Sequence, residues 1–524
     1  MNIVSYLDEH AEKIPDKIAL SMRLNNKTEM ITFRELHEKS ATFASAMKKI
    51  GLKPKDRVIL MIPMSIELYV AMLGLIRMGA VVIFIDPWIK LRQIAAFATF
   101  SEAKAFIGIG KSHILRLLDK RLFKLPITVT TTNSFCGFPA KYSYNKIMGN
   151  AKADYSIFDC SVEDSALITF TSGSSGLPKG ANRTHGFLNA QHKALQSEFS
   201  YNDNDVDMPM FPVFALNNLA RGITSVIPDI DFKNISNIAV DKIIDQINEF
   251  KVTTATASPP FFLQLANSKE VKNMNLRRIL TGGAAISASE LKILRKAWEI
   301  SDIQVVYGST EAEPVAHLTL EERLEIEEKN FKGYCIGKPI EKLKTAVIAI
   351  TKEDVKWNQS YKSLALPQGE VGELIVSGDH VCNSYFKNDE AVKSNKIIDN
   401  ENQLWHRMGD TGYFDENGYF HLVGRVHSTI FCKSGLVHAQ LIEKKVQNFL
   451  SVRTALLALP AENGFEKSVL IVTGNEDYEI KQKLLAISEI DEVIFITKAF
   501  PLDPRHKSKV DYIKLKEMIM EGKI

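Results

Sequence analysis

RVILMIPMSIELYVAMLGLIRMGAVVIFIDP, residues 57–87, is the stretch that decides the fold. RVILMIP is almost wholly apolar and predicts a buried strand. SIELYVAMLGLIRM predicts a helix that Ser65 caps at its start and Gly79 ends. AVVIFIDP predicts a second buried strand, stopped by Pro87. A helix between two such strands implies that they run parallel, so we expect an α/β fold with helices on the faces of a parallel sheet.

The same alternation returns later in the chain. Helical, extended, strand, helical and strand patterns follow one another over residues 242–250, 253–260, 276–284, 287–300 and 303–311. From about residue 340 the pattern changes to short strands separated by Gly and Asn-Gly turns, which predicts a small antiparallel β subdomain. After about residue 430 a compact set of mixed elements closes the chain. We therefore expect a large multi-subdomain α/β body followed by a small α+β C-terminal domain.

Composition limits the classes of partner. The chain has 524 residues, too many for one hydrophobic core, with 45% hydrophobic and 24% charged residues. A formal net charge of +3, from 65 basic and 62 acidic residues, argues against nucleic acid as the main partner.

Cysteine usage and the N-terminus favour a cytoplasmic protein. The 5 cysteines are far apart in the sequence and form no CxxC pair, so we expect reduced thiols. The first residues become acidic before any apolar run develops, which is not typical of a signal peptide. The most apolar region, 58–85, is interrupted by Glu67 and Arg77, so we expect no transmembrane segment. The cysteines are Cys136, Cys160, Cys335, Cys382 and Cys432.

TFTSGSSGLPKGANRTH, residues 169–185, is the first stretch that suggests chemistry. It lies between a predicted strand, SALITF, and a helix expected from about Thr184. Such a Gly- and Ser-rich turn gathers free N–H groups that suit an anionic oxygen, and Lys179 adds a positive charge. Because Gly180 follows Lys179 and no Gly-x-Ser-x-Gly occurs, neither a Walker loop nor a hydrolase elbow fits. Composition alone leaves a flexible linker open. The candidate phosphate-binding residues are Thr171, Ser172, Gly173, Ser174, Ser175, Gly176 and Lys179.

A set of motifs that follow one another along the chain decides between a phosphate-binding loop and a flexible linker. The chain resembles the adenylate-forming enzymes, which include acyl-CoA synthetases, fatty acid and aryl ligases, peptide-synthetase adenylation domains and luciferases. The segments that carry the resemblance are TSGSSGLPKG (171–180), YGSTE (307–311), GEVGELIVSG (369–378), GDTGYFDENGYFHLVGR (409–425) and PRHKSKV (504–510). It implies that ATP and Mg²⁺ activate a carboxylic acid as an acyl adenylate, with release of pyrophosphate. Attack of a carboxylate on the α-phosphate brings two anions together, so cations must offset the charge.

The resemblance also implies a nucleotide site. The glycine-rich loop would bind the β- and γ-phosphates, and a loop of Gly282, Gly283 and Ala284 would receive the adenine. Tyr307 and the adjacent Gly308 would lie at the adenine face. Asp410 would bind the ribose hydroxyls with help from Arg425. Without the resemblance, a glycine pair is more often a plain turn, and Asp-Thr-Gly could be an Asx-turn.

Catalytic roles follow from the same comparison. Glu311 would hold Mg²⁺, Thr310 would contact the α-phosphate, and Lys509 would bridge the carboxylate and the α-phosphate. Without the resemblance, Glu311 could be a solvated acid of a loop, and Lys509 could be a solvated lysine of the surface. The implied domains are a nucleotide- and acyl-binding body of residues 1–424, a hinge of residues 425–427 centred on His427, and a lid of residues 428–524 that brings Lys509 to the site.

Departures from the family pattern fall in the part that serves the second half-reaction. Ser508 stands where a glycine is usual, and His427 where an Asp or Lys is usual. In IFCKSGLVHAQLIE, the usual Lys, Gly, Pro and Glu are replaced by Phe431, Ser434, Ala439 and Leu441. Segments 211–232, 309–317 and 501–511 are similar to a branch of fatty acid ligases that includes the β-lactone synthetase of the bacterial olefin pathway. In that synthetase the substrate's own hydroxyl can displace AMP, so no thiol is needed.

The acyl pocket is harder to place from the sequence. Phe214 lies where the family has an aromatic residue or histidine beside the carboxylate. FPVFAL, 211–216, suits a hydrophobic acid but could equally be plain core. Arg221 could meet a polar group of the substrate or a neighbouring carboxylate.

Our expectation is therefore an ATP-dependent, AMP-forming ligase that acts on a fatty or β-hydroxy fatty acid. The adenylate would pass to CoA or to the thiol of an acyl carrier protein. Ring closure to a β-lactone without CoA is the alternative, and a nucleotide-binding scaffold without catalysis is the alternative from another class. Amide formation would need an amine site that we do not locate in the sequence.

Overall fold

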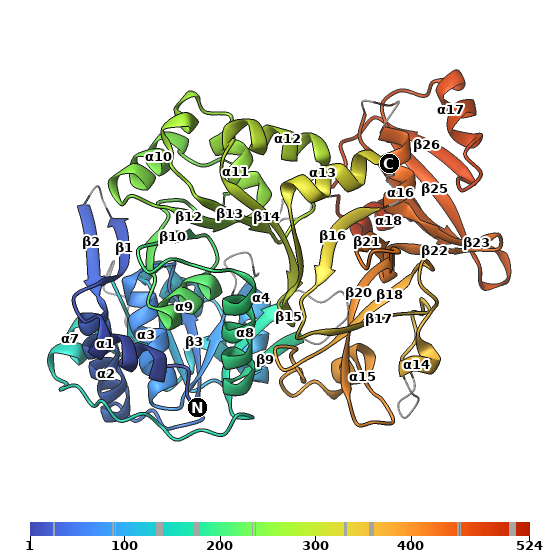
Figure 1. The fold of residues 1–524 in the computed structure, drawn as a ribbon. Helices are drawn as coiled ribbons and strands as arrows, with labels where there is room; N and C mark the ends of the chain where they lie inside the picture. Colours follow the sequence, from blue (N-terminus) through green and yellow to red (C-terminus); the bar gives the residue numbers. More distant parts are fainter. Residues whose placement is uncertain are drawn as a thin grey trace. The chain divides into compact units, whose positions relative to one another are not determined.

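The computed structural model divides into two compact units, which are described separately (Figure 1). The first comprises Met1–Glu321, Ile340–Lys344 and Ser377–Lys396; the second comprises Glu322–Pro339, Thr345–Val376 and Ile397–Ile524. The predicted division at residues 425–427 stays a prediction. The structure describes residues 1–24, 27–85, 89, 91–132, 140–171, 179–232, 234–235, 237–329, 333–355, 361–447, 450, 452–501 and 510–523.

Residues 57–85 form the strand–helix–strand unit that the sequence predicts. Strand β3 (Arg57–Met61) pairs in parallel with β4 (Val81–Phe84), and helix α3 (Ile66–Arg77) connects them. The Ser65 hydroxyl accepts a hydrogen bond from the Leu68 amide at 3.2 Å, which caps the helix as expected. Gly79 follows the helix with φ +78°, a conformation that costs glycine little. The predicted Ser65 cap, the end of the helix at Gly79 and the parallel pairing are confirmed, and Pro87 lies outside the described residues.

One sheet of the first unit has 7 strands in the order β7-β6-β5-β3-β4-β8-β9. Its strands are parallel except for β9, which runs antiparallel to β8 with Thr171 opposite Lys179. Strand β9 was not predicted, but the helix expected from about Thr184 is confirmed, because α8 (His185–Glu198) begins there with Thr184 as its N-cap. The remaining strands are β5 (Ala105–Gly108), β6 (Ile127–Thr130), β7 (Tyr142–Ser143), β8 (Ser165–Thr171) and β9 (Lys179–Thr184).

A second sheet of the same unit has the order β15-β14-β13-β12-β10-β11-β1-β2. The run from β14 to β1 is parallel, and β15 and β2 are antiparallel to their neighbours. This matches the predicted alternation over residues 242–311. The strands are β1 (Ile18–Leu24), β2 (Lys27–Thr32), β10 (Val206–Pro209), β11 (Thr224–Ile227), β12 (Thr254–Ala257), β13 (Arg278–Gly282), β14 (Asp302–Ser309) and β15 (Ala312–Thr319).

Helices pack against both sheets of this unit. Helix α3 contacts β4 of one sheet and β1 of the other, and almost all of its residues are buried. Its Arg77 is fully buried, paired with Asp8, and donates to the Tyr155 carbonyl at 2.9 Å, which compensates the loss of water around its charge. The other helices are α1 (Ser5–Lys13), α2 (Phe33–Lys49), α4 (Leu91–Phe100), α5 (Gly110–Leu117), α6 (Lys120–Phe123), α7 (Tyr144–Gly149), α8 (His185–Glu198), α9 (Pro212–Arg221), α10 (Val240–Glu249), α11 (Pro259–Ala266), α12 (Ala288–Ala297) and α15 (Asp389–Asn395).

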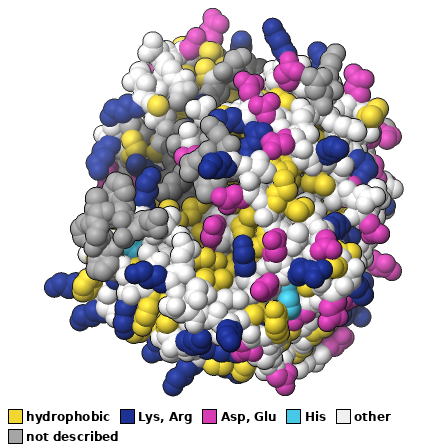
Figure 2. Space-filling view, turned by 90° about the vertical axis from the view of Figure 1, so that its left-hand side faces the viewer, with side chains coloured by type: hydrophobic (Ala, Val, Ile, Leu, Met, Phe, Trp, Pro, Cys, Tyr) yellow, Lys and Arg dark blue, Asp and Glu magenta, His cyan; other side chains and the backbone are white. Residues whose placement is uncertain are grey.

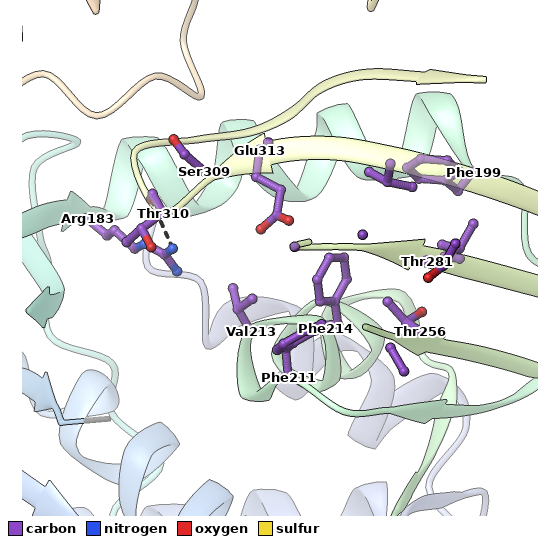
Figure 3. A pocket seen from close by; sticks show the side chains of 16 residues that line it. Arg183, Phe199, Phe211, Val213, Phe214, Thr256, Thr281, Ser309, Thr310 and Glu313 are labelled. Carbon is purple, nitrogen blue, oxygen red and sulfur yellow. Dashed lines mark hydrogen bonds between the residues drawn. The ribbon is translucent and has the colours of Figure 1, made fainter. Parts of the chain in front are cut away.

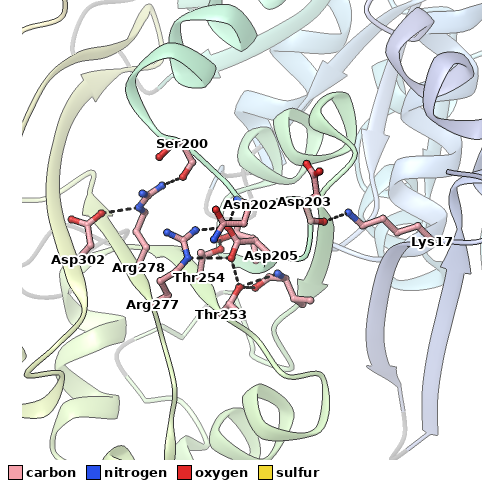
Figure 4. A network of polar contacts seen from close by, with 12 residues as sticks. Lys17, Ser200, Asn202, Asp203, Asp205, Thr253, Thr254, Arg277, Arg278 and Asp302 are labelled. Atoms are coloured by element: carbon pink, nitrogen blue, oxygen red, sulfur yellow. Dashed lines mark hydrogen bonds and ion pairs between the residues drawn. The ribbon is translucent and has the colours of Figure 1, made fainter. Parts of the chain in front are cut away.

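A polar network holds the amino ends of β10, β12 and β13 together (Figure 4). Asp205 accepts hydrogen bonds from Thr253 Oγ1 at 2.8 Å and Arg277 Nε at 3.2 Å. Arg278 Nε binds Asp302 Oδ2 at 2.9 Å, which adds the start of β14. Because these groups fix one end of the parallel strands, the opposite, carboxyl ends are held in a defined arrangement.

In the second unit, the first strands pair antiparallel and the C-terminal strands pair in both directions, as predicted. One sheet contains β17, β18, β20, β21 and β16 in this order, with antiparallel pairs β18–β20, β20–β21 and β21–β16. The C-terminal part pairs β24 with β25 antiparallel and β25 with β26 parallel. The elements are α13 (Leu320–Lys329), β16 (Tyr334–Pro339), β17 (Lys344–Ile348), α14 (Tyr361–Leu364), β18 (Gly372–Ser377), β19 (Lys396–Ile398), β20 (Leu404–Phe414), β21 (Phe420–Arg425), β22 (Thr429–Cys432), β23 (Gly435–His438), α16 (Ala439–Gln447), β24 (Thr454–Pro460), β25 (Glu466–Thr473), α17 (Tyr478–Leu485), β26 (Glu492–Ile496) and α18 (Tyr512–Met520).

Charged side chains of both signs are mixed over the face drawn in Figure 2. Among the described residues, no helix has both the length and the apolar character needed to cross a membrane.

Candidate active site

A cavity of about 300 Å³ opens at the carboxyl ends of β12, β13 and β14 (Figure 3). Ligands of open α/β sheets bind at this end of the strands. One part of the wall is apolar, and the other part is a polar turn with backbone groups. The lining residues are Arg183, Phe199, Phe211, Val213, Phe214, Thr256, Ala257, Leu280, Thr281, Gly282, Gly283, Val306, Gly308, Ser309, Thr310 and Glu313.

The glycine turn after β13 fits close to the neighbouring backbone. A Cβ on Gly282 would lie 2.4 Å from the Val306 carbonyl oxygen of β14, so no side chain is tolerated there without movement. Gly283 has φ +76° and is exposed. The turn therefore presents bare backbone to the cavity, which suits a flat ring such as adenine. Both glycines lie where the sequence predicts an adenine loop, and Ala284 follows them as a half-buried residue.

Helix α9 and the end of α8 supply an aromatic wall. Phe214 is 9% exposed and lies on α9, which begins at Pro212 and ends before Gly222 in a left-handed conformation. The rings of Phe211 and Phe214 are 6.1 Å apart between centroids. In Figure 3 both rings lie below the β14–β15 strands and face the cavity. An apolar acyl or aryl group would replace water against this wall.

The turn between β14 and β15 carries the predicted YGSTE motif. The Ser309 hydroxyl accepts hydrogen bonds from the amides of Glu311 at 3.3 Å and Ala312 at 3.2 Å, which shapes the turn. Gly308 and Thr310 line the cavity. Tyr307 lies on the same strand but is not among the lining residues. Arg183 of β9 donates from Nη2 to the Thr310 carbonyl at 3.0 Å and so ties this turn to the other sheet of the first unit.

Glu311 is held by the segment that follows β18. Tyr385 donates its hydroxyl to Glu311 Oε1 at 3.0 Å, and the Cys382 amide donates to the Glu311 carbonyl at 2.7 Å. Behind them, the buried Lys396 ammonium binds the Cys382 carbonyl, and burial lowers the pKa of Lys396 to about 8. These contacts fix both the backbone and the side chain of Glu311.

The fit to Mg²⁺ rests on Glu311. Among the described residues, no group of 3 or more His, Cys, Asp or Glu side chains could enclose a metal ion. Mg²⁺ bound with a nucleotide needs only one or two carboxylates, because phosphate oxygens and water complete its coordination. A half-buried carboxylate with one oxygen fixed by Tyr385 meets that requirement.

Glu313 lines the cavity and is a residue that the sequence analysis missed. It lies on β15, and burial raises the pKa of its carboxyl to about 7, while the Arg183 guanidinium opposes part of this shift. Its backbone carbonyl accepts from Gln191 Nε2 at 3.1 Å. The sequence STEAEPVAH contains a signal for this position. Alternate residues of a strand lie on the same face, so Glu313 lies on the same face as the buried Val315.

Other predicted residues lie apart from this cavity or outside the described residues. Arg221 is not a lining residue; its guanidinium lies 4.6 Å from the centre of the Tyr201 ring. Lys179 is the half-buried first residue of β9, and Thr171 ends β8. Ser172, Gly173, Ser174, Ser175, Gly176 and Lys509 lie outside the described residues.

The predicted ribose pair is formed within the second unit. Asp410 on β20 lies opposite Arg425 on β21, and Arg425 Nε binds Asp410 Oδ1 at 2.7 Å. The Asp410 carboxylate is buried, and the Arg425 side chain is 51% exposed. His427 follows as an exposed residue in a short 3₁₀ turn, Val426–Ser428. The roles of these residues stay predictions.

Comparison with known proteins identifies the family. Residues 7–386 match the family described as AMP-binding enzyme. The chain belongs to this family. It is an enzyme of the adenylate-forming superfamily, as the sequence motifs indicate.

Relatives of this family span the whole chain. The chain is 30% identical over 544 aligned residues to an olefin β-lactone synthetase of Stenotrophomonas maltophilia, covering 98% of this chain and 97% of the relative. It is 23% identical to a 4-coumarate–CoA ligase of Vanilla planifolia, covering 96% and 91%. Among solved structures, the ATP-bound MatB of Rhodopseudomonas palustris matches with a TM-score of 0.79 and 20% identity, covering 99% of each chain, which confirms the α/β fold.

Proposed function

We propose that this enzyme uses ATP to activate a hydrophobic β-hydroxy carboxylic acid as its acyl adenylate and then closes the β-lactone with loss of AMP. The observation that supports it best is the cavity itself. An aromatic wall around Phe214 meets a bare glycine turn and the Thr310 turn within about 300 Å³. Such a space takes the acyl group on one side and the reacting carboxylate and phosphate on the other.

The residues of the site have distinct tasks in the first half-reaction. Gly282 and Gly283 accommodate the adenine, and Asp410, oriented by Arg425, binds the ribose hydroxyls. Thr310 contacts the α-phosphate, and Lys509 and the Ser172–Gly176 loop add positive charge and N–H donors. These contacts orient the carboxylate for in-line attack on the α-phosphorus and reduce the repulsion between the two anions. When bound through Glu311, Mg²⁺ supplies further positive charge to the phosphates.

The proposed second half-reaction rests on the relatives and on an altered segment. The relative at 30% identity is named a β-lactone synthetase. At the place of the usual lysine, the Phe431 ring lies 4.7 Å from the Lys352 ammonium, and its amide donates to Glu466 Oε2 at 3.0 Å. Ala439, at the place of the usual proline, is the buried first residue of α16. Phe431 and Ala439 thus replace the lysine and the proline that are usual in the thioester-forming members of the family.

Transfer to CoA or a carrier thiol, the first expectation from the sequence, is the second candidate. It is supported by the 4-coumarate–CoA ligase, which matches 96% of this chain. The two candidates share the adenylate and differ only in the group that displaces AMP, which is the hydroxyl of the substrate or an external thiol.

One experiment separates them. The enzyme is incubated with ATP, Mg²⁺ and a panel of fatty and β-hydroxy fatty acids, with and without CoA, and the products are identified by mass. We expect AMP and a product 18 mass units below the β-hydroxy acid, without CoA. AMP release that depends on CoA would favour the thioester instead. Lys509→Ala should remove nearly all pyrophosphate exchange while ATP binding remains.

A further inference from the structure

The connection between β5 and β6 carries a cluster of exposed apolar side chains. Ile114, Leu115 and Leu118 are 40%, 36% and 69% exposed, and Phe123 is 56% exposed. Among the described residues, no other stretch of ten holds more than two large apolar side chains that are exposed in this way. Single exposed apolar residues are normal on protein surfaces, whereas a group of them marks a contact surface.

Helix α5 turns its apolar face outward. Its exposed residues Lys111, Ile114 and Leu115, with Leu118 directly after the helix, recur at the spacing of one helix face. In an ordinary surface helix of a folded domain, that apolar face would pack against the core. The outward apolar face of α5 therefore does not contribute to packing within the chain.

Polar residues of α5 attach it to the sheet instead. The Ser112 hydroxyl donates to the Met61 carbonyl at 3.1 Å, and His113 Nε2 donates to the Val129 carbonyl at 2.9 Å. Both side chains are buried, and these hydrogen bonds offset the loss of water around them. The helix is thus fixed from its inner side, and its orientation holds the apolar face toward solvent.

Helix α6 extends the same surface. Arg116, buried on α5, donates from Nη1 to the Phe123 carbonyl at 3.1 Å, and its guanidinium lies 5.7 Å from the centre of the Phe123 ring. Asp119 caps α6 by accepting from the Arg121 amide at 2.9 Å. The exposed Phe123 ring therefore lies next to α5.

The surface around these apolar side chains is basic. Residues 110–125 contain five basic residues and one acid, a net charge of +4 in a chain whose total is +3. The single acid, Asp119, is paired with Arg121 at 2.7 Å. The exposed basic residues are Lys111, Lys120, Arg121 and Lys124. The segment thus combines exposed apolar groups with a local excess of positive charge.

We propose that this surface, the α5–α6 patch, docks the enzyme on an anionic lipid bilayer. Its apolar side chains enter the boundary between head groups and acyl chains, and its lysines bind lipid phosphates. Docking of this kind needs no membrane-spanning helix. It is independent of which group displaces AMP from the adenylate. The patch consists of Lys111, Ile114, Leu115, Leu118, Lys120, Arg121, Phe123 and Lys124.

The charge of the patch favours a bilayer over a second copy of the chain. Two copies that met through this surface would bring their lysines together, and like charges repel. An anionic bilayer offers phosphates to all of the exposed cations at once. Nucleic acid would also match the charge, but it provides no apolar medium for Leu118 and Phe123.

Vesicle flotation of the intact enzyme tests the docking. The probes are vesicles of phosphatidylcholine alone and of phosphatidylcholine mixed with phosphatidylglycerol. We expect the wild type to float with the mixed vesicles at low salt, and to be released by high salt or in neutral vesicles. Leu118→Ser combined with Phe123→Ser should lower the partition coefficient at least tenfold. Ile300→Ser, at an isoleucine that is 94% exposed outside the patch, is the matched control and should keep the wild-type value.

Lys120→Gln combined with Lys124→Gln tests the charge separately. Each lysine near an anionic surface changes the partition coefficient about fivefold, so loss of both should lower it about 25-fold. Lys269→Gln combined with Lys393→Gln removes the same charge at two exposed lysines outside the patch and should change little. All of these side chains are exposed, so we expect the wild-type melting temperature in each variant.

Three results would overturn the docking. The first is a wild-type enzyme that does not float with the mixed vesicles. The second is flotation that both patch variants retain, because the contact with lipid would then lie elsewhere. The third is a dimer in sedimentation velocity that the Leu118 and Phe123 substitutions dissociate, without flotation of the wild type. That result would assign the patch to a second copy of the chain.

Discussion

The Tyr385 hydroxyl lies 3.0 Å from Glu311 Oε1, although 74 positions separate the two residues in the chain. It fixes the carboxylate that is expected to hold Mg²⁺. Hydrogen bonds to charged groups contribute about 1.5–3 kcal/mol. We expect Tyr385→Phe to lower the rate of pyrophosphate exchange about tenfold or more and to raise the Mg²⁺ concentration needed for half-maximal rate.

Tyr144→Phe is the control for this substitution, because Tyr144 is a buried tyrosine of α7 away from the site. It should leave both quantities unchanged. An unchanged Mg²⁺ requirement in Tyr385→Phe would show that the contact does not orient Glu311 for the metal.

Gly282→Ala tests the fit of the glycine turn. The new Cβ would meet the Val306 carbonyl at 2.4 Å, so β13 and β14 must separate or the turn must shift into the cavity. We expect the KM for ATP in pyrophosphate exchange to rise at least tenfold. Gly149→Ala is the control, since a Cβ there meets nothing within 4 Å. Equal KM values for the two variants would contradict the adenine role of this turn.

Phe214→Ala tests the acyl wall. Removal of the ring enlarges the cavity next to the expected position of the carboxylate and removes apolar contact area. We expect kcat/KM for the preferred acid to fall about tenfold and the preference to move toward bulkier acids, as measured by pyrophosphate exchange over a chain-length series. Phe123→Ala, at an exposed phenylalanine, should keep the original preference. A Phe214 variant with the same chain-length profile would indicate that Phe214 is plain core.

Local patterns predicted the fold well, because their causes lie within a few residues. The strand, cap and helix of residues 57–85 depend on neighbouring apolar residues and on Ser65, so the sequence contains them completely. Strand β9 was missed because KGANRT has a composition typical of a loop. It forms by antiparallel pairing with β8, and Asn182 and Gly180 add hydrogen bonds to Ser384 and Phe386, which are about 200 positions away.

The same reason explains what was missed at the site. The motifs located Thr310 and Glu311, but the link between Arg183 and Thr310 spans 127 positions and has no local signal. Glu313 is visible as an acid in a strand, yet its raised pKa comes from burial, which only the folded chain produces. Arg221 was expected at the substrate because it stands in an apolar stretch. In the fold, that stretch packs it over Tyr201 instead.

Asp410→Asn tests the ribose contact. The substitution removes the charge that binds Arg425 and one acceptor for the ribose hydroxyls. We expect the KM for ATP to rise about tenfold or more, while the KM for the acid changes little. Glu416→Gln, at an exposed acid of the turn between β20 and β21, is the control. A parallel rise in both KM values would point to a structural role for Asp410.

Glu443 makes the packing of the C-terminal part depend on pH. Its buried carboxylate accepts from the Leu456 amide at 2.7 Å and from the Tyr512 hydroxyl at 2.8 Å, which joins α16, β24 and α18. Burial raises the pKa of Glu443 to about 7. The folded form therefore binds more protons than the unfolded form above the ordinary glutamate pKa, so the stabilisation is complete at low pH and declines until the pH passes about 7.

Glu443→Gln mimics the neutral carboxyl at every pH. We expect equal hydrogen-exchange protection of the α18 segment in the wild type and the variant at pH 5, and better protection of the variant at pH 8. A raised pKa of this size corresponds to an upper limit of about 3 kcal/mol. Because both proteins are compared at the same pH, the intrinsic exchange rates cancel. Protection that is lower in the variant at pH 8 would mean that the ionised carboxylate, through its bonds to Tyr512 and Leu456, is the form that stabilises this packing.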